Sequence, residues 1–357
     1  MAEAEIFDIL KILAPGTQLR DGLENILNAK TGALIVVGDS QEILSLVDGG
    51  FYINKDYSPT YIYELAKMDG AIILSKDLKK ILYANAMLIP NSTIPSEETG
   101  TRHKTADRVA KQTKELVISI SSRRSMITIY KGNKKYILKD ASVVLTKANQ
   151  ALQTLEKYKI VLDNALTALG RLEFEDAVTT EDVLKSVQRI EMVLRVASEI
   201  EGYICELGTE GRLVKMQLTE LVKNVDDEEL RLIDDYIFED SRKTALDYKM
   251  SLRNFSYTEL TDLSNIAKVL GYNYTADLYD VAVSPRGYRL LYKIQRLPHN
   301  IINNLVERFS SFQAILNASV EELDDVEGIG EVRIKAIKEG LERLGEQLLM
   351  EDKRIKI

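Results

Sequence analysis

The feature that most constrains the fold of this chain is an unbroken apolar run near its N-terminus. Residues 32–39 read Gly-Ala-Leu-Ile-Val-Val-Gly-Asp, an apolar segment bounded by glycines. A short run that is apolar at every position indicates a strand buried on both faces, as in a sheet covered by helices on each side. The run therefore predicts a central strand of an α/β domain.

Segments with helical and strand patterns surround this strand. Apolar residues at helical spacing predict helices over 3–13 and 18–29, with Pro15-Gly16 as the break between them. The other predicted strands are 71–74, 81–88, 116–121, 126–130 and 135–138, the last two joined as a hairpin across Lys131-Gly132-Asn133. Strands mixed with helices predict one mixed-sheet α/β domain over residues 1–140.

The stretch 100–106, Gly-Thr-Arg-His-Lys-Thr-Ala, has an anion-binding composition at the opening of a predicted helix. Unpaired backbone N–H groups and the positive end of the helix dipole favour phosphate there. Thr101 and Thr105 add hydroxyl donors, and Arg102 and Lys104 add positive charge. Taken alone, such a run is more often a solvated helix start than a catalytic loop.

A second polar motif stands directly before the predicted strand 71–74. Asp69 and Gly70 precede Ala71, the first residue of that apolar run. A carboxylate at a strand end beside a phosphate site is a natural ligand for Mg²⁺ or Mn²⁺. Together the two motifs indicate a phosphate site with a metal-ligating carboxylate beside it.

The two motifs resemble the paired signatures of the diadenylate cyclase domain family, Asp-Gly-Ala and Gly-Thr-Arg-His-Arg-Thr-Ala. Lys104 stands where the family usually has its second Arg, so a point charge replaces a planar fork. Ser122 likewise replaces an Arg that some members carry. The resemblance implies ATP binding by Gly70, Ala71, Leu88, Thr101, Arg102, His103, Lys104, Thr105, Ser121 and Arg124.

The resemblance further implies roles for individual residues. Asp69, Arg102 and His103 are the expected catalytic residues, with Asp69 holding the metal ion. For His103, phosphate binding is favoured, and general acid catalysis is the alternative. Leu88 has a simple core role as its alternative, and residues 121–124 have an ordinary charged turn as theirs.

Composition excludes several classes of protein. The 357 residues suffice for two or three domains, and the net charge of −8 argues against a chain that coats nucleic acid indiscriminately. The single cysteine, Cys205, excludes an intramolecular disulfide and fits a reducing compartment. The acidic start, Met1 to Glu5, lacks the basic residues of a signal peptide, and no apolar run is long enough to span a bilayer. We expect a cytoplasmic protein without a membrane segment.

The middle of the chain, residues 141–285, has the pattern of long helices. Leu145, Leu152 and Leu166 recur at multiples of seven, with Lys159 interrupting the series, and Leu155, Leu162 and Leu169 fill the companion positions. This indicates an all-α helical spine. The acidic residues between 226 and 235 have two interpretations, a metal site or a solvated helix start, and the second is favoured.

The C-terminal part, residues 286–357, contains a capping box, a turn and a long helix. Ser319 and Glu322 have capping-box spacing, and helical spacing returns from Glu331 to Leu348. Helix, Gly-Ile-Gly turn and helix resemble the helix-hairpin-helix motif, although Ile334 stands where the motif usually has Ala. The resemblance implies phosphate contacts to DNA by Gly328, Ile329, Gly330, Lys335 and Lys338, with Lys353, Arg354 and Lys356 as flanking candidates. A structural hairpin without DNA function is the alternative.

The three parts together resemble the layout of the DNA integrity scanning family. That layout implies condensation of two ATP molecules into cyclic di-3′,5′-AMP and two pyrophosphates, at an interface between two subunits of a homo-octamer. It also implies a nucleoid-associated protein whose cyclase activity branched DNA is expected to lower. The rival interpretations are a DNA-binding scaffold with a decayed cyclase domain and a DNA repair enzyme.

Overall fold

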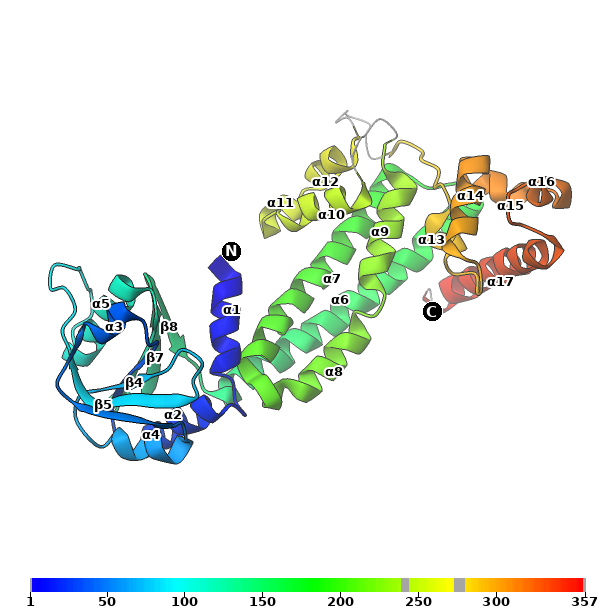
Figure 1. The fold of residues 1–357 in the computed structure, drawn as a ribbon. Helices are drawn as coiled ribbons and strands as arrows, with labels where there is room; N and C mark the ends of the chain where they lie inside the picture. The colour runs from blue at the N-terminus through cyan, green and yellow to red at the C-terminus, as the bar shows by residue number, and fades with distance from the viewer. Residues whose placement is uncertain (1, 239–243, 273–279, 356–357) are drawn as a thin grey trace. The chain divides into compact units, whose positions relative to one another are not determined.

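A computed structural model describes residues 2–238, 244–272 and 280–355, with side chains from residue 7 to residue 350 outside the two gaps (Figure 1). The chain forms two compact units. Unit 1 comprises Met1–Asn149 with Glu201–Lys215, and unit 2 comprises Gln150–Ile200 with Met216–Ile357. The predicted domains had different limits, 1–140, 141–285 and 286–357. The two units are described separately.

Unit 1 is built on a mixed sheet, as the sequence predicted, and the sheet has eight strands where six were predicted. Its strand order is β2-β5-β4-β1-β6-β7-β8, with β3 also paired to β5. The central pair β1 and β4 is parallel, and β1 is antiparallel to β6 on its other side. The strands are β1 (Ala33–Val37), β2 (Val47–Asp48), β3 (Phe51–Asp56), β4 (Ala71–Leu74), β5 (Lys80–Leu88), β6 (Leu116–Ser121), β7 (Met126–Lys131) and β8 (Lys134–Leu138).

Helices cover both faces of this sheet (Figure 1). On one face, Ala33, Ile35 and Val37 of β1 pack in a core with α2 (Gln18–Asn28) and α4 (Pro59–Leu65), to which α1 (Ala2–Ile12) contributes Ile9. On the other face, Leu34 and Val36 pack with α3 (Gln41–Leu44) and α5 (Thr101–Thr113). Because β1 is buried at every position, an apolar run without alternation is what this location requires.

The helices and strands predicted for unit 1 are confirmed, but four further elements were not predicted. These are β2, β3, α3 and α4. Strand β3 is exposed at nearly every position and carries Asn54 at a φ of 47°, so it has no apolar alternation by which a strand could be recognised. Its pairing with β5 is what makes it a strand.

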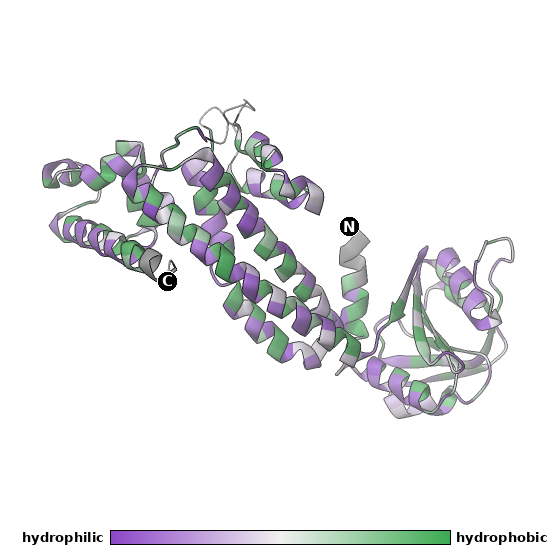
Figure 2. Ribbon diagram, turned by 180° about the vertical axis from the view of Figure 1, so that it is seen from behind, coloured by the Kyte–Doolittle hydropathy of each residue, from purple (hydrophilic) through white to green (hydrophobic). Residues whose placement is uncertain are grey.

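The described part of unit 2 is helical. Green and purple segments alternate along these helices in Figure 2, as expected of amphipathic helices with one buried stripe. Gly208 to Gly211 form a 3-10 turn, and the second long helix begins at Thr180. The helices of this part are α6 (Ala141–Glu175), α7 (Thr180–Leu207), α8 (Arg212–Leu221), α9 (Val225–Tyr236), α10 (Ala245–Arg253), α11 (Tyr257–Thr261) and α12 (Leu263–Leu270).

The remaining helices of unit 2 surround a core of their own. They are α13 (Tyr288–Leu291), α14 (His299–Phe309), α15 (Phe312–Asn317), α16 (Val320–Asp324) and α17 (Glu331–Ile355). Their core contains Phe312, Ile329 and Ile337, and Phe174 at the end of α6 packs against it. Phe174 and Phe312 meet edge to face with ring centroids 5.1 Å apart. The C-terminal helices are thus packed onto α6.

A buried polar cluster fixes α13 within unit 2. Arg289 is fully buried and forms ion pairs with Glu173 of α6 and Glu228 of α9. Asp235 accepts the backbone N–H groups of Gly287, Tyr288 and Arg289 at 2.7–2.9 Å. Such a network is stabilising only while every partner is present, because a buried charge without a partner is strongly unfavourable.

The prediction that the acidic residues between 226 and 235 are a solvated helix start was wrong for two of them. Glu229 is 0% exposed and Asp235 is 2% exposed. Both lie on the buried face of α9, where cationic side chains and backbone donors from other helices compensate their charge. Among the described residues, no group of three or more His, Cys, Asp and Glu could hold a metal ion, so the metal alternative has no support there either.

Candidate active site

The first turn of α5 is open to an anion. Gly100 is the N-cap residue and provides no side-chain cap, and no acidic residue lies in the first turn. Lys104 N donates to Gly100 O at 2.8 Å, so the N–H groups of residues 101–103 precede the first hydrogen bond of the helix. These donors, together with the positive end of the helix dipole, favour a phosphate group.

Gly70 is required by the way β4 begins. Its φ is 98°, and a Cβ at this position would lie 2.8 Å from the carbonyl carbon of Asn85 and 2.9 Å from the carbonyl oxygen of Ala86. A side chain would therefore overlap the backbone of β5. The glycine lets the start of β4 lie directly against β5, a reason for the residue that is independent of any substrate.

The two sequence motifs meet at one groove, whose volume is about 470 Å³. One wall is apolar and is formed by strand residues, while hydroxyl, guanidinium and imidazole groups from the start of α5 form the other. An apolar wall facing a cationic, hydroxyl-bearing one suits a ligand with an aromatic and an anionic part. The lining residues are Leu34, Gly70, Ala71, Ala86, Met87, Leu88, Gly100, Thr101, Arg102, His103 and Thr105.

Most of the residues expected to bind ATP line this groove, but not all. Lys104, Ser121 and Arg124 are outside the lining. The predicted metal ligand Asp69 is also outside it, as an exposed residue directly before Gly70. Leu88 is 7% exposed and belongs to the core under α5 while it also lines the groove, so its two predicted roles coincide in position. The groove also includes Leu34, Ala86 and Met87, which sequence reasoning did not select.

Arg102 lies over the backbone of Gly32, at the beginning of β1. A Cβ built at Gly32 would overlap the guanidinium group of Arg102 and would lie 3.1 Å from the carbonyl oxygen of Ile120. The glycine that bounds the central apolar run thus leaves room for the guanidinium beside the groove. Its function as a strand boundary was predicted, whereas its contact with Arg102 was not.

His103 is anchored by a tyrosine from β7. Its Nδ1 is 3.0 Å from the hydroxyl of Tyr130, while its Nε2 is buried and has no hydrogen-bond partner among the residues that the structure describes. Tyr130 is also hydrogen-bonded to the carboxylate of Glu98, and Glu98 pairs with Lys135 of β8. Tyr130 and Lys135 are direct cross-strand partners, which explains why both reach Glu98.

The charges around His103 are mostly positive. Burial lowers the pKa of His103; the Glu98 carboxylate opposes this effect, and Lys135, Arg124 and Arg102 lower the pKa further. Arg124 therefore influences the imidazole although it lies outside the groove lining. Burial and these cations therefore favour the neutral imidazole.

Sequence reasoning missed Glu98, Tyr130 and Lys135. Tyr130 stands at the end of the otherwise apolar or hydroxyl-bearing run Met-Ile-Thr-Ile before Lys131, and it is only 1% exposed. A buried tyrosine needs a partner for its hydroxyl group. That requirement is the signal in the sequence, but it does not say which residue is the partner.

Asp69 offers one oxygen donor for a divalent cation. An exposed carboxylate beside an anion-binding groove fits Mg²⁺ or Mn²⁺, because such ions are commonly held by one or two carboxylates, water and substrate phosphates. The described residues contain no site with three or more acidic, histidine or cysteine ligands. The donor set therefore fits an ion that arrives with the nucleotide.

The candidate DNA-contacting turn lies between α16 and α17. The predicted capping box of Ser319 and Glu322 is present. Gly328 has a φ of 83°, and a Cβ there would lie 2.8 Å from Ile301 Cδ1, whereas a Cβ at Gly330 would meet nothing within 4 Å. Ile329 is buried in the core of the C-terminal helices.

The predicted lysines of this region differ in their surroundings. The side chain of Lys335 is 76% exposed, 3.7 Å from Glu339, whereas Lys338 Nζ donates to the carbonyl oxygen of Ala318 at 2.8 Å. Ile334 is buried, which explains a larger side chain than Ala at that position. The side chains of Lys353, Arg354 and Lys356 lie outside the described residues.

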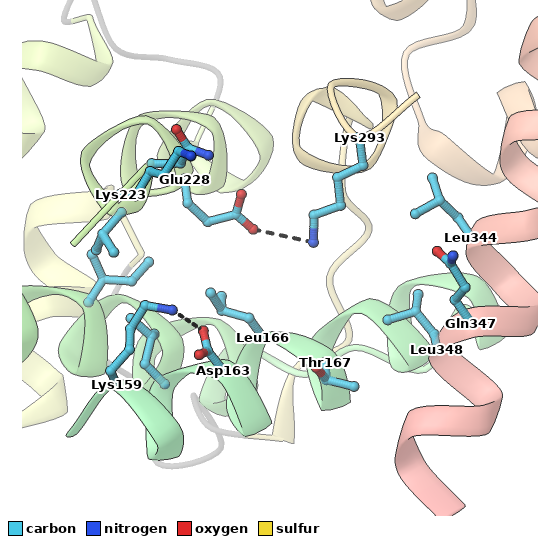
Figure 3. A pocket seen from close by; sticks show the side chains of 14 residues that line it. Lys159, Asp163, Leu166, Thr167, Lys223, Glu228, Lys293, Leu344, Gln347 and Leu348 are labelled. Carbon is cyan, nitrogen blue, oxygen red and sulfur yellow. Dashed lines mark hydrogen bonds and ion pairs between the residues drawn. The ribbon is translucent and has the colours of Figure 1, made fainter. Parts of the chain in front are cut away.

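A second cavity, of about 410 Å³, lies within unit 2 (Figure 3). Lys159, which interrupts the leucine series of α6, pairs there with Asp163 at 2.5 Å. Lys293 lies 3.6 Å from Glu228 across the cavity. Lys159 and Lys293 are thus matched by carboxylates that also line the cavity. The pair with Asp163 explains why a lysine is tolerated in the leucine series.

No helix among the described residues is both long enough and apolar enough to cross a membrane.

Comparison with known proteins identifies two family regions. Residues 20–135 match the model described as DisA bacterial checkpoint controller nucleotide-binding, and residues 138–279 match the model described as DisA bacterial checkpoint controller linker region. The two matches cover most of unit 1 and the long helices that follow it.

Full-length relatives carry one name, DNA integrity scanning protein DisA. The protein from Acetivibrio thermocellus is 62% identical over 352 residues, covering 98% of this chain and 97% of the relative. The protein from Carboxydothermus hydrogenoformans is 59% identical, covering 97% of this chain and 99% of the relative. A protein from Clostridium botulinum is 57% identical and covers 98% of both.

Proposed function

This chain belongs to the DNA integrity scanning protein DisA family, and on that premise we propose that it is a diadenylate cyclase. Two ATP molecules are condensed into cyclic di-3′,5′-AMP with release of two pyrophosphates. The observation that carries the proposal is the meeting of the open, cationic start of α5 with Gly70 and Ala71, the residues that directly follow Asp69, at a single groove.

The groove assigns a part of ATP to each of its walls. The apolar wall with Leu88 and Ala86 receives the adenine, and the first turn of α5 receives the triphosphate. Thr101 and Thr105 donate hydroxyl hydrogens to phosphate oxygens, and Arg102 and Lys104 neutralise their charge. Catalysis is then mainly electrostatic, because positioned donors and cations stabilise the charge that develops as pyrophosphate leaves.

Asp69 holds a divalent cation beside this wall. When bound, Mg²⁺ or Mn²⁺ neutralises triphosphate charge and polarises the attacking 3′-hydroxyl. Ser121 and Arg124 lie outside the groove lining, in and after the strand end of β6, where they reach the distal phosphates of a bound nucleotide. Each nucleotide's 3′-hydroxyl attacks the α-phosphate held by a second copy of the chain, so the complete site requires two subunits.

Product formation tests this proposal. The full-length protein is incubated with ATP and Mg²⁺ or Mn²⁺, and the products are separated by chromatography. We expect cyclic di-AMP from the wild type and from Asp56→Asn, an exposed carboxylate on β3 outside the groove lining, and none from Asp69→Asn. Absence of product from the wild type with either metal would instead favour the scaffold interpretation.

Lys104→Arg tests the departure from the family motif. The planar guanidinium restores bidentate phosphate contact, so we expect product formation at least equal to the wild type. A loss of activity in this variant would show that the start of α5 contacts phosphate differently from the proposed arrangement.

We further propose that the turn at residues 328–330 contacts DNA phosphates and that branched DNA bound there lowers cyclase activity. Gly330→Ala is a clean probe, because the added methyl meets no protein atom while it separates the turn from a phosphate. We expect weaker binding to a four-way junction with unchanged folding and unchanged cyclase activity without DNA. Equal junction binding by wild type and variant would contradict this contact.

We also propose a homo-octamer in which paired cyclase domains complete each other's sites. Sedimentation equilibrium then gives eight times the chain mass of 40.3 kDa. A monomer that forms cyclic di-AMP at a rate independent of its concentration would contradict the two-subunit site.

A further inference from the structure

The two ring nitrogens of His103 have unlike surroundings, and the difference is not explained by phosphate binding alone. Nδ1 is 3.0 Å from the Tyr130 hydroxyl, while Nε2 is buried and unpaired among the described residues. An unpaired buried nitrogen is unfavourable, so the arrangement is suited to a partner that arrives later. His103 also lines the groove.

Glu98 determines the direction of the hydrogen bonds that link it through Tyr130 to His103. Lys135 and the Tyr130 hydroxyl keep the pKa of Glu98 below its ordinary range despite burial, so Glu98 is ionised and only accepts. The Tyr130 hydroxyl therefore donates to Glu98, and its oxygen is left to accept from Nδ1–H of His103. In the neutral imidazole this leaves Nε2 with a lone pair.

Three elements bring charge to this imidazole. Arg102 comes from α5, Arg124 from the turn after β6, and Lys135 from β8, with Glu98 as the anion that faces them. The cations disfavour a positive ring while no substrate is bound. A bound triphosphate opposes that effect, because its negative charge offsets the charge of the surrounding cations.

The geometry points to Glu98 and Tyr130 as positioning residues for His103. They hold Nδ1 as a hydrogen-bond donor and leave Nε2 free to accept a proton. Nε2 takes this proton from solvent when a nucleoside triphosphate binds and donates it to a phosphate oxygen. The inference rests on the proposed nucleotide site and adds two residues outside its motifs. Tyr130 and Glu98 do not touch the substrate. They act through the imidazole, as an orienting carboxylate does in other histidine sites.

The tautomer of His103 is directly measurable, because the chain contains only two histidines, His103 and His299. The full-length protein is labelled with ¹⁵N-histidine and examined by magic-angle-spinning NMR at pH 8, and a His299→Gln variant assigns the signals. We expect the Nδ1–H tautomer in the free protein, and imidazolium after addition of α,β-methylene-ATP with Mg²⁺. An Nε2–H tautomer in the free protein overturns the inference.

Two substitutions separate the hydrogen bond from the charge. Tyr130→Phe removes the acceptor of Nδ1–H, so the tautomer preference is lost and cyclic di-AMP formation falls roughly tenfold or more, as expected for a hydrogen bond to a charged group. The imidazolium is also less stabilised, so its pKa is lower. The decline of the rate with rising pH therefore begins at a lower pH than in the wild type. Glu98→Gln keeps an acceptor for Tyr130, so the tautomer is retained while the pH–rate profile shifts in the same direction.

Tyr136→Phe is the matched control. It removes a phenol that donates to a carboxylate, Glu206, at 2.7 Å in the same unit but away from the groove. We expect wild-type tautomer, rate and pH profile in this variant. Equal losses in Tyr130→Phe and Tyr136→Phe would show a merely structural role and overturn the inference, as would an unchanged tautomer in Tyr130→Phe.

The outcomes for this inference and for the proposed function are distinguishable. Absence of cyclic di-AMP from the wild type refutes the cyclase, and absence of imidazolium with the nucleotide analogue refutes the link between His103 and triphosphate. The tautomer of the free protein tests the hydrogen-bonded chain from Glu98 through Tyr130 to His103 without any substrate.

Discussion

Replacement of Gly70 by alanine tests whether the close approach of β4 and β5 builds the groove. The backbone at Gly70 has a φ of 98°, which costs an L-residue about 1–2 kcal/mol. The new Cβ would also lie 2.8 Å from Asn85 C and 2.9 Å from Ala86 O, atoms of a strand backbone that cannot rotate away. Relief of this overlap adds about 1–3 kcal/mol, as for other overpacked positions.

The expected total is about 2–5 kcal/mol, and it is local to the β4–β5 pair. Hydrogen exchange with mass spectrometry detects such a loss as faster exchange of the paired amides, roughly 30-fold to 4,000-fold, since about 1.4 kcal/mol corresponds to a factor of ten. Because Ala71 and Ala86 both line the groove and are cross-strand partners, we expect cyclic di-AMP formation to fall with it.

Gly49→Ala is the control for the backbone term. Gly49 also has a positive φ, 64°, but a Cβ there would meet nothing within 4 Å. We expect only the conformational cost, confined to the turn between β2 and β3, with normal exchange in β4 and product formation near that of the wild type. If exchange in β4 and β5 is no faster in Gly70→Ala than in Gly49→Ala, the overlap with β5 has no energetic consequence and the reasoning is refuted.

Two further predictions concern unit 2. Arg289→Met leaves the buried carboxylate of Glu173 without its cation, so we expect the free energy of unfolding to fall by about 3–5 kcal/mol. The measurements are the midpoint of urea unfolding, which should be lower, and hydrogen exchange in α13, which should be faster. A loss no larger than that of the exposed Lys335→Met would refute the importance of the buried pair. Burial and the neighbouring Glu229 raise the pKa of Glu191 to about 8, from an ordinary value of 4.5. The folded protein then holds a proton that the unfolded chain has lost, so this stabilising contribution, on the order of a few kcal/mol, is full below about pH 4.5 and is lost as the pH rises through about 8. Thermal unfolding between pH 5 and pH 9 measures it, and the same pH dependence in Glu191→Gln would assign it to another group.

Several features of this protein follow from the sequence because they depend on neighbours along the chain. The run of residues 33–37 is a buried strand because every side chain is apolar, and Ser319 caps a helix because Glu322 stands three residues later. The same holds for α5, which begins at Thr101 as predicted. The residues of the two nucleotide motifs were likewise selected from local patterns, and most of them line one groove.

Other features are decided by the tertiary structure, because their physical cause lies far away along the chain. The exposed strand β3 exists only through its pairing with β5. Glu229 is buried because Lys249 and Arg253 of α10 reach it, which a pattern within α9 does not reveal.

For the same reason, His103 could be recognised from the sequence but its hydrogen-bond partners could not. The imidazole was recognised from its motif, whereas the residue that orients it comes from a strand 27 positions later and depends on Glu98 and Lys135 in turn. A local pattern shows that a side chain is polar, and periodicity shows on which face it lies. Which donor meets which acceptor is determined only when the sheet and α5 bring their side chains within hydrogen-bonding distance.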